Sequence, residues 1–275
     1  MFGIFKGTPV LSEEDTYFQV ATFKWLLKNF GGDDFYHHAD LILPTRDYFS
    51  SKVESSEQAA VETFLAIKKY AGMGEWPCKL EAQEDDLETN IAPTLTIQNV
   101  PQNPHGTFEL KASNEIVITY NPELVKNPTL LVATLAHELS HYLTATSPEE
   151  PPGGWDNWEF ATDITATFLG FGVFMANSAF NFHQFTEVGS QGWRYNHSGY
   201  LSESEHIYAL AIFLLLKKIP IEKALSHLKP NLRKLLKKCI KELSASEHIE
   251  ELLAVAFSPP SDLTNASSLT PKSPR

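Results

Sequence analysis

The sequence predicts an α+β protein in which a small antiparallel sheet precedes a mainly helical C-terminal half. Short runs with alternating apolar and polar residues occupy 94–98, 107–112 and 115–121, as is typical of strands. From residue 122 onward, the apolar residues instead recur at helical spacing. The 275 residues, 43% of them hydrophobic and 20% charged, are also ordinary for a globular chain that buries a substantial core.

Two helices are expected before the sheet, over 13–30 and 55–71. The first begins with three acids and ends at a pair of glycines, which are helix boundary signals. The second has apolar residues near helical spacing. Residues 41–45 between them read as a short extended segment, and the acidic stretch Glu81–Glu88 reads as a solvated loop.

Four helices are expected after the sheet, over 127–146, 156–180, 202–218 and from Pro230 onward. Asn127 followed by Pro128 is a typical N-cap with proline at the first helical position. Ser202 and Glu205 form a capping box. The helix that Pro230 opens has an apolar stripe, and its opposite face carries the basic residues Arg233, Lys234, Lys237, Lys238 and Lys241.

These patterns divide the chain into an N-terminal α+β subdomain (1–126), a helical subdomain (127–257) and a tail (258–275). The tail is rich in proline and serine and is expected to be disordered. The apolar stretches 164–182 and 207–216 are interpreted as buried core helices, because the first contains several polar residues and glycines and the second is too short to span a bilayer.

The charge and the cysteine count limit the classes of partner and the cellular compartment that are expected. The formal net charge of −12 excludes general nucleic-acid binding, which depends on neutralising phosphates. The charge is unevenly divided, with 25 acids and 10 bases in residues 1–163 but 9 acids and 12 bases in residues 164–275. Two cysteines cannot make a disulfide framework, and the N-terminal apolar run is too short for a secretory signal, so a cytoplasmic location is expected.

The helix predicted over 127–146 carries the motif His-Glu-Leu-Ser-His at residues 137–141. Residues four apart share one face of a helix, so His137 and His141 can both bind one zinc ion. Glu138 then lies beside the ion, where it can act as general base toward a zinc-bound water.

A third zinc ligand is expected on the next helix, where Glu159 and Asp163 are again four residues apart. Glu159 has the reach to bind the metal, whereas the shorter Asp163 is suited to accept the N–H of a ligating histidine. Apolar residues surround both acids in the sequence, so two unpaired carboxylates would be costly to bury there. A zinc ion would supply the missing positive charge.

This pair of motifs, H-E-x-x-H followed by E-x-x-x-D, resembles the gluzincin (thermolysin-like) group of zinc metallopeptidases over His137–Asp163. The resemblance implies a zincin-like fold, one zinc ion held by His137, His141 and Glu159, and Glu138 as the catalytic base. It also implies that an edge strand before the active-site helix binds extended substrate, and residues 115–121 stand in that position.

A transition-state donor is expected from the polar cluster 193–200. Tyr195, His197 or Tyr200 could donate a hydrogen bond to a developing oxyanion. The resulting hypothesis is a zinc metallopeptidase with a peptide or protein substrate and no integral membrane span. Two alternatives remain open: a zinc-stabilised interaction protein without turnover, and an enzyme that uses the same site on a non-peptide amide.

Overall fold

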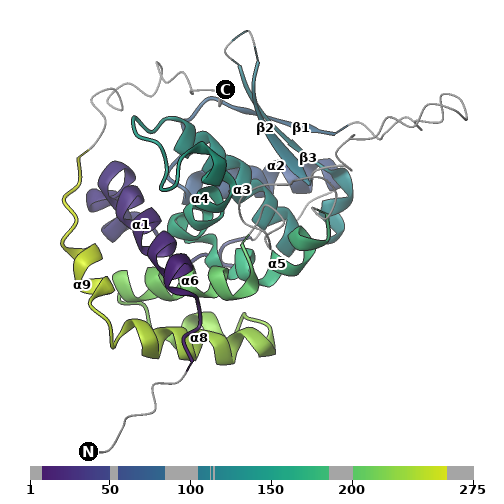
Figure 1. Cartoon of the computed structure of the whole chain (residues 1–275). Coiled ribbons are helices and arrows are strands. Elements are labelled where there is room, and N and C mark those ends of the chain that lie inside the picture. Colours follow the sequence, from purple (N-terminus) through teal and green to yellow (C-terminus); the bar gives the residue numbers. More distant parts are fainter. Residues whose placement is uncertain are drawn as a thin grey trace, which may run out of the picture.

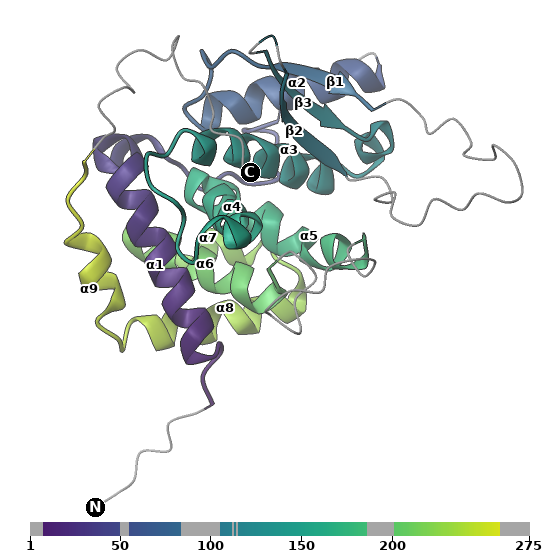
Figure 2. The same cartoon turned by 45° about the horizontal axis from the view of Figure 1, so that its top comes forward.

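The computed structural model describes residues 8–49, 55–83, 105–111, 113, 115–185 and 201–258. Its helices and strands are labelled in Figure 1, except α7, which is labelled in Figure 2. In chain order they are α1 (Glu13–Phe30), α2 (Ser56–Tyr70), β1 (Lys79–Ala82), β2 (Gly106–Leu110), β3 (Ile116–Tyr120), α3 (Pro128–Ala145), α4 (Trp158–Ala166), α5 (Gly172–Phe185), α6 (Glu203–Leu216), α7 (Ile221–Leu225), α8 (Pro230–Leu243) and α9 (His248–Leu253). The fold is therefore mixed α+β, as predicted.

The elements are arranged in layers, and α3 lies in the interior. Figure 2 shows the sheet at one end of the molecule, α3 beneath it, α4 and α6 below α3, and α8 at the opposite end. Helix α3 contacts β2 and β3 on one side and α4 and α5 on the other. Every residue of α3 from Leu130 to Ala145 is consequently buried.

The sheet has the strand order β1-β3-β2 and is mixed. Strand β2 runs antiparallel to β3, whereas β1 runs parallel to it, so the prediction of an antiparallel sheet was wrong for β1. Sequence analysis also assigned Glu81 to a loop, but this residue lies in β1 opposite Thr119. The strand expected over 94–98 falls outside the described residues.

The helix expected over 156–180 is divided into α4 and α5 by a π-helical segment, Thr167–Phe171. Gly170 in this segment has a φ of +102°, which favours glycine. A Cβ added to Gly170 would lie 2.1 Å from the Asp40 carbonyl oxygen, and the Ile42 amide donates to the Gly170 carbonyl over 3.0 Å. The segment around Asp40 and Ile42 can therefore pack against the π-helical segment only because residue 170 is a glycine.

The hydrophobic core is one continuous cluster that includes residues from both predicted subdomains, from Leu11 to Leu252. Helix α6, which contains the apolar stretch 207–216, is buried in it along nearly its whole length. Among the described residues, no helix combines the length and the apolar character that crossing a membrane requires.

Candidate metal site

The histidine motif lies in the middle of α3, where the packing of this helix fixes the side chains. The Asn127 side chain accepts the Leu130 amide and caps the N-terminus of α3. Nine residues of α3, 128–136, precede His137, so the motif stands well inside the helix, between the sheet and α4. His137, Glu138 and His141 are 3%, 6% and 7% exposed.

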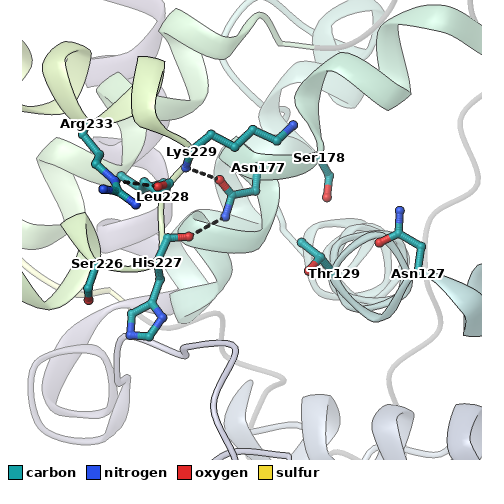
Figure 3. Close-up of a pocket in the computed structure, with 9 residues that line it drawn as sticks. All are labelled: Asn127, Thr129, Asn177, Ser178, Ser226, His227, Leu228, Lys229 and Arg233. Atoms are coloured by element: carbon teal, nitrogen blue, oxygen red, sulfur yellow. Dashed lines mark hydrogen bonds between the residues drawn. The ribbon is translucent and has the colours of Figure 1, made fainter.

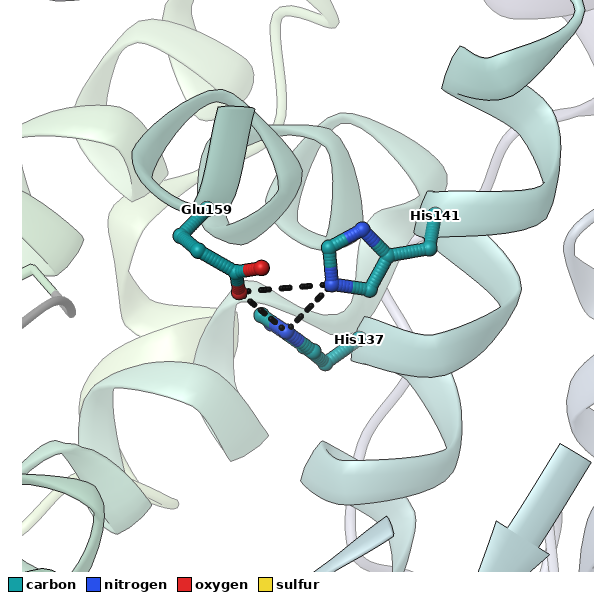
Figure 4. Close-up of side chains that lie close together, drawn as sticks. All are labelled: His137, His141 and Glu159. Carbon is teal, nitrogen blue, oxygen red and sulfur yellow. Dashed lines mark hydrogen bonds and ion pairs between the residues drawn. The ribbon is translucent and has the colours of Figure 1, made fainter. Parts of the chain in front are cut away.

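Figure 4 shows the two imidazoles and the Glu159 carboxylate pointing toward one another from α3 and α4. The Nε2 atoms of His137 and His141 are 3.0 Å apart, and each is 3.3 Å from Oε2 of Glu159. We call these three residues the candidate metal site. The structure thus brings together the three side chains that the sequence suggested as zinc ligands.

These separations fit a tetrahedral ion. Ligand atoms around zinc at its usual bond lengths of about 2.0–2.1 Å are about 3.3–3.4 Å apart. Three atoms at the observed separations lie about 1.85 Å from a common centre, slightly less than zinc's bond lengths, so these three residues would hold one zinc ion. Among the described residues, no fourth histidine, cysteine, aspartate or glutamate joins the group.

The far nitrogen of each imidazole is held by a residue of α4. Asp163 Oδ1 lies 2.9 Å from His137 Nδ1, and Thr162 Oγ1 lies 3.2 Å from His141 Nδ1. With Nδ1 donating to the carboxylate, Nε2 of His137 presents its lone pair to the centre of the site. Asp163 therefore occupies the orienting position that was expected for it, and Thr162 is a partner that sequence analysis did not identify.

Asp163 is itself held on its other oxygen. Oδ2 accepts the Leu201 amide over 3.0 Å and lies 3.7 Å from Nε2 of His206. His206 is fully buried on α6 and has no hydrogen-bond partner on either ring nitrogen among the described residues. Burial lowers the pKa of His206, which favours its neutral form. The Asp163 carboxylate thus links α4, α3 and the start of α6.

The acids and histidines of the site shift one another's pKa values. Burial raises the pKa of the Glu138 carboxyl, as expected for a carboxylate removed from water. Partial desolvation acts in the same direction on Glu159, whose side chain keeps an exposed side, but hydrogen bonds from His137 and His141 outweigh it and lower the pKa of Glu159 well below its usual range. Burial also opposes protonation of His137, yet Asp163 and Glu159 raise its pKa. A metal ion would replace the proton that these carboxylates hold on His137.

Aromatic rings shield one side of the candidate metal site. The Trp158 ring lies edge-on to His141 with centroids 4.6 Å apart, and its Nε1 donates to Thr144 Oγ1 over 2.7 Å. Phe108 of β2 stacks at 6.4 Å on the His141 ring. These rings exclude water from the imidazole and restrict its rotation. Phe108 was not identified from the sequence, because nothing in the β2 pattern shows that this strand crosses the motif.

Strand β2, not β3, is the strand at the edge of the described sheet beside the site. The resemblance assigned the substrate-binding edge to residues 115–121, but β3 is the central strand, so this assignment was wrong. Strand β2 approaches α3 closely at Gly106. A Cβ added there would lie 2.8 Å from the Thr119 carbonyl oxygen and 3.1 Å from Cγ of Glu138.

Replacing Gly106 with alanine is expected to destabilise the protein by about 1–3 kcal/mol, because the added methyl group overpacks the β2–α3 contact. The measurement is chemical denaturation followed by circular dichroism. Gly74→Ala is the matched control, since a Cβ at Gly74 meets nothing within 4 Å. Equal stability of the two variants would contradict the close approach of β2 to Glu138.

Replacing Asp163 with asparagine is expected to weaken zinc binding by about 10–100-fold, the usual effect of losing the partner that orients a ligating histidine. The amide lacks the negative charge that fixes the His137 tautomer. Its nitrogen would also face the Leu201 amide or the imidazole, and neither arrangement preserves both hydrogen bonds. Competition with a chelator of known affinity measures the effect, and Asp156→Asn, at an exposed position just before α4, is the control. Wild-type affinity in Asp163→Asn would show that Asp163 does not orient His137.

The three residues suggested as oxyanion donors, Tyr195, His197 and Tyr200, lie outside the described residues. The described chain resumes at Leu201, whose amide is bonded to Asp163 as noted above. Their role in catalysis therefore stays a prediction.

Comparisons with protein-family models, with curated proteins and with solved structures found no match to this chain.

Proposed function

We propose that this chain is a zinc-dependent hydrolase that cleaves peptide bonds, with a zincin-like arrangement of sheet and active-site helix. The observation that carries the proposal is the convergence of His137 Nε2, His141 Nε2 and Glu159 Oε2 within 3.3 Å of one another, with Glu138 beside them on α3. The resemblance to the gluzincin motif names the same residues.

The donor set favours zinc and a catalytic site over a structural one. Two histidines and one glutamate are a typical ligand set for catalytic zinc, whereas structural zinc sites are usually closed by a fourth protein ligand, often cysteine. No fourth histidine, cysteine or acid joins the cluster among the described residues. When bound, the zinc ion would polarise a substrate carbonyl and lower the pKa of a water molecule to about 7.

Glu138 is the residue that would move the proton in this reaction. It adjoins His137 in the chain, is 6% exposed and has a raised pKa because it is buried. A base of this kind accepts a proton from the attacking water and delivers it to the leaving amine. His137 and His141 are held by Asp163 and Thr162, so neither imidazole is free to take over this role.

The edge of β2 supplies a reason to choose a peptide as substrate. The His105 carbonyl accepts the Asn121 amide just after β3, and the Lys111 amide donates to the Glu115 carbonyl just before it. Because bonded residues alternate along an antiparallel ladder, Thr107 and Glu109 also face β3. The N–H and C=O groups of Gly106, Phe108 and Leu110 consequently point away from β3, toward an edge that no described strand occupies. An extended peptide can pair with such an edge through main-chain hydrogen bonds.

The proposal is tested with the purified full chain, loaded with one equivalent of zinc and incubated with a library of internally quenched peptides. We expect cleavage that a zinc chelator abolishes and that added zinc restores. Stoichiometric zinc without cleavage of any peptide would instead favour a zinc-stabilised interaction protein. Cleavage of non-peptide amides alone would show that the substrate is not a peptide. Failure to bind zinc at all would overturn the proposal.

A further inference from the structure

A second site with distinct chemistry lies at the start of α3. A cavity of about 500 Å³ opens between the first turn of α3, the middle of α5 and the segment that joins α7 to α8 (Figure 3). Its lining consists of Asn127, Thr129, Asn177, Ser178, Ser226, His227, Leu228, Lys229 and Arg233. It shares no residue with the candidate metal site, and Thr129 stands eight residues before His137, which is about 12 Å along the helix.

The frame of this cavity is fixed by hydrogen bonds that leave the Lys229 ammonium and the terminal nitrogens of Arg233 unused. The Asn177 side chain donates to the His227 carbonyl over 2.8 Å and accepts the Lys229 amide over 3.0 Å. Arg233 Nε donates to the Leu228 carbonyl over 2.8 Å, as Figure 3 also shows. The connecting segment is thereby attached both to α5 and to α8. The cavity wall is preorganised, which lowers the cost of ordering it around a ligand.

The charged groups of the lining are hydrogen-bond donors. The Lys229 ammonium and the terminal nitrogens of Arg233 make no hydrogen bond or ion pair with the described residues, and both side chains are exposed. The lining contains neither aspartate nor glutamate. The nearby acid Glu203 does not line the cavity and accepts a hydrogen bond from Asn231. The charged groups of this lining are therefore both positive.

Two neutral donors complete this arrangement. Ser178 is 1% exposed, and its hydroxyl has no hydrogen-bond partner among the described residues, which is costly for a buried polar atom. Figure 3 shows this hydroxyl directed toward the side of the cavity where Thr129 lies. Thr129 belongs to the first turn of α3, where Pro128 has no N–H and Asn127 accepts the Leu130 and Leu131 amides, so the Thr129 amide is the donor that remains beside the positive end of the helix dipole.

We propose that this cavity binds the phosphate group of a small phosphorylated molecule. Lys229 and Arg233 neutralise the charge of the phosphate, and the Ser178 hydroxyl with the first turn of α3 donates to its remaining oxygens. The cavity volume lies in the range of small-molecule sites and exceeds what a bare phosphate ion needs, so the ligand carries an organic group beside the phosphate. This inference does not depend on the proposed hydrolase activity.

The test is isothermal titration of the full chain with inorganic phosphate and with phenyl phosphate, at constant ionic strength, with sodium chloride as the blank. We expect saturable binding of both probes, with phenyl phosphate the tighter. Lys229→Gln is expected to weaken both by at least 10-fold, and Ser178→Ala is expected to weaken them less. Lys238→Gln is the matched control, since Lys238 is exposed on α8 and does not line the cavity.

The outcomes separate a built site from general attraction to the basic face of α8. Equal losses in Lys229→Gln and Lys238→Gln would show that binding is a property of the whole face, and would overturn the proposal. Absence of saturable binding would overturn it as well. Equal affinity for the two probes would contradict the proposal that the cavity recognises an organic group beside the phosphate. Circular dichroism of each variant verifies that its fold is intact.

Discussion

Replacing Glu138 with glutamine is expected to leave the zinc content at one ion per chain and to lower peptide hydrolysis by about 10²–10⁴-fold, the usual worth of a general base. The amide has nearly the same shape as the carboxylate, so the packing of Glu138 against Gly106 is preserved. It cannot accept a proton from water at neutral pH. The measurements are metal analysis of the purified variant and its turnover of a cleaved peptide.

Glu57→Gln is the control for this substitution, because Glu57 is an exposed glutamate in the first turn of α2. It should retain both zinc and turnover. Full turnover by Glu138→Gln would remove Glu138 from the mechanism and leave the geometry of the candidate metal site without its assigned base. Loss of zinc from Glu138→Gln would point to Glu138 as a ligand rather than a base.

Removing one member of the candidate metal site is expected to abolish both stoichiometric zinc and hydrolysis. His141→Ala removes a nitrogen 3.0 Å from His137 Nε2, and Glu159→Ala removes the only carboxylate oxygen of the set. Each loss should weaken zinc binding by more than the about 10–100-fold that an orienting partner contributes. Inductively coupled plasma mass spectrometry after dialysis against a weak chelator measures the retained metal.

Asp156→Ala is the matched control for Glu159→Ala, because Asp156 is an exposed acid one turn earlier in the chain. It should retain one zinc ion per chain. If Glu159→Ala also retained the ion, the third ligand would have to be Asp163 or a residue outside the described part of the chain. Thermal denaturation of each variant with and without zinc distinguishes the loss of a ligand from the loss of the fold.

The helices that begin at strong local signals could be predicted from the sequence. The Ser202–Glu205 capping box is present at the start of α6, and Asn127 caps α3 ahead of Pro128. Strand β1 could not be predicted, because its four residues are largely exposed and its pairing with β3 joins segments far apart in the chain. The break at Gly170 likewise depends on a distant contact, with Asp40.

In the candidate metal site, too, local spacing could be predicted from the sequence and contacts between distant segments could not. Helical spacing brings His137 and His141 to one face of α3, and the greater length of glutamate distinguishes Glu159 from Asp163. The partners on the far side of the site could not be predicted in this way. Thr162 reaches His141 only because α4 packs against α3, and His206 approaches Asp163 only because α6 packs against α4.

The unequal exposure of the three proposed ligands has a consequence for how an ion is loaded. His137 and His141 are almost fully enclosed, whereas 47% of the Glu159 side chain is in contact with solvent. Because residues of α4 hold both imidazoles, we expect capture of the proposed ion not to require folding of the chain around it, in contrast to small zinc-dependent domains. We expect the proposed ion to enter and leave by way of the exposed Glu159, so that its occupancy would follow the concentration of free zinc around a folded protein.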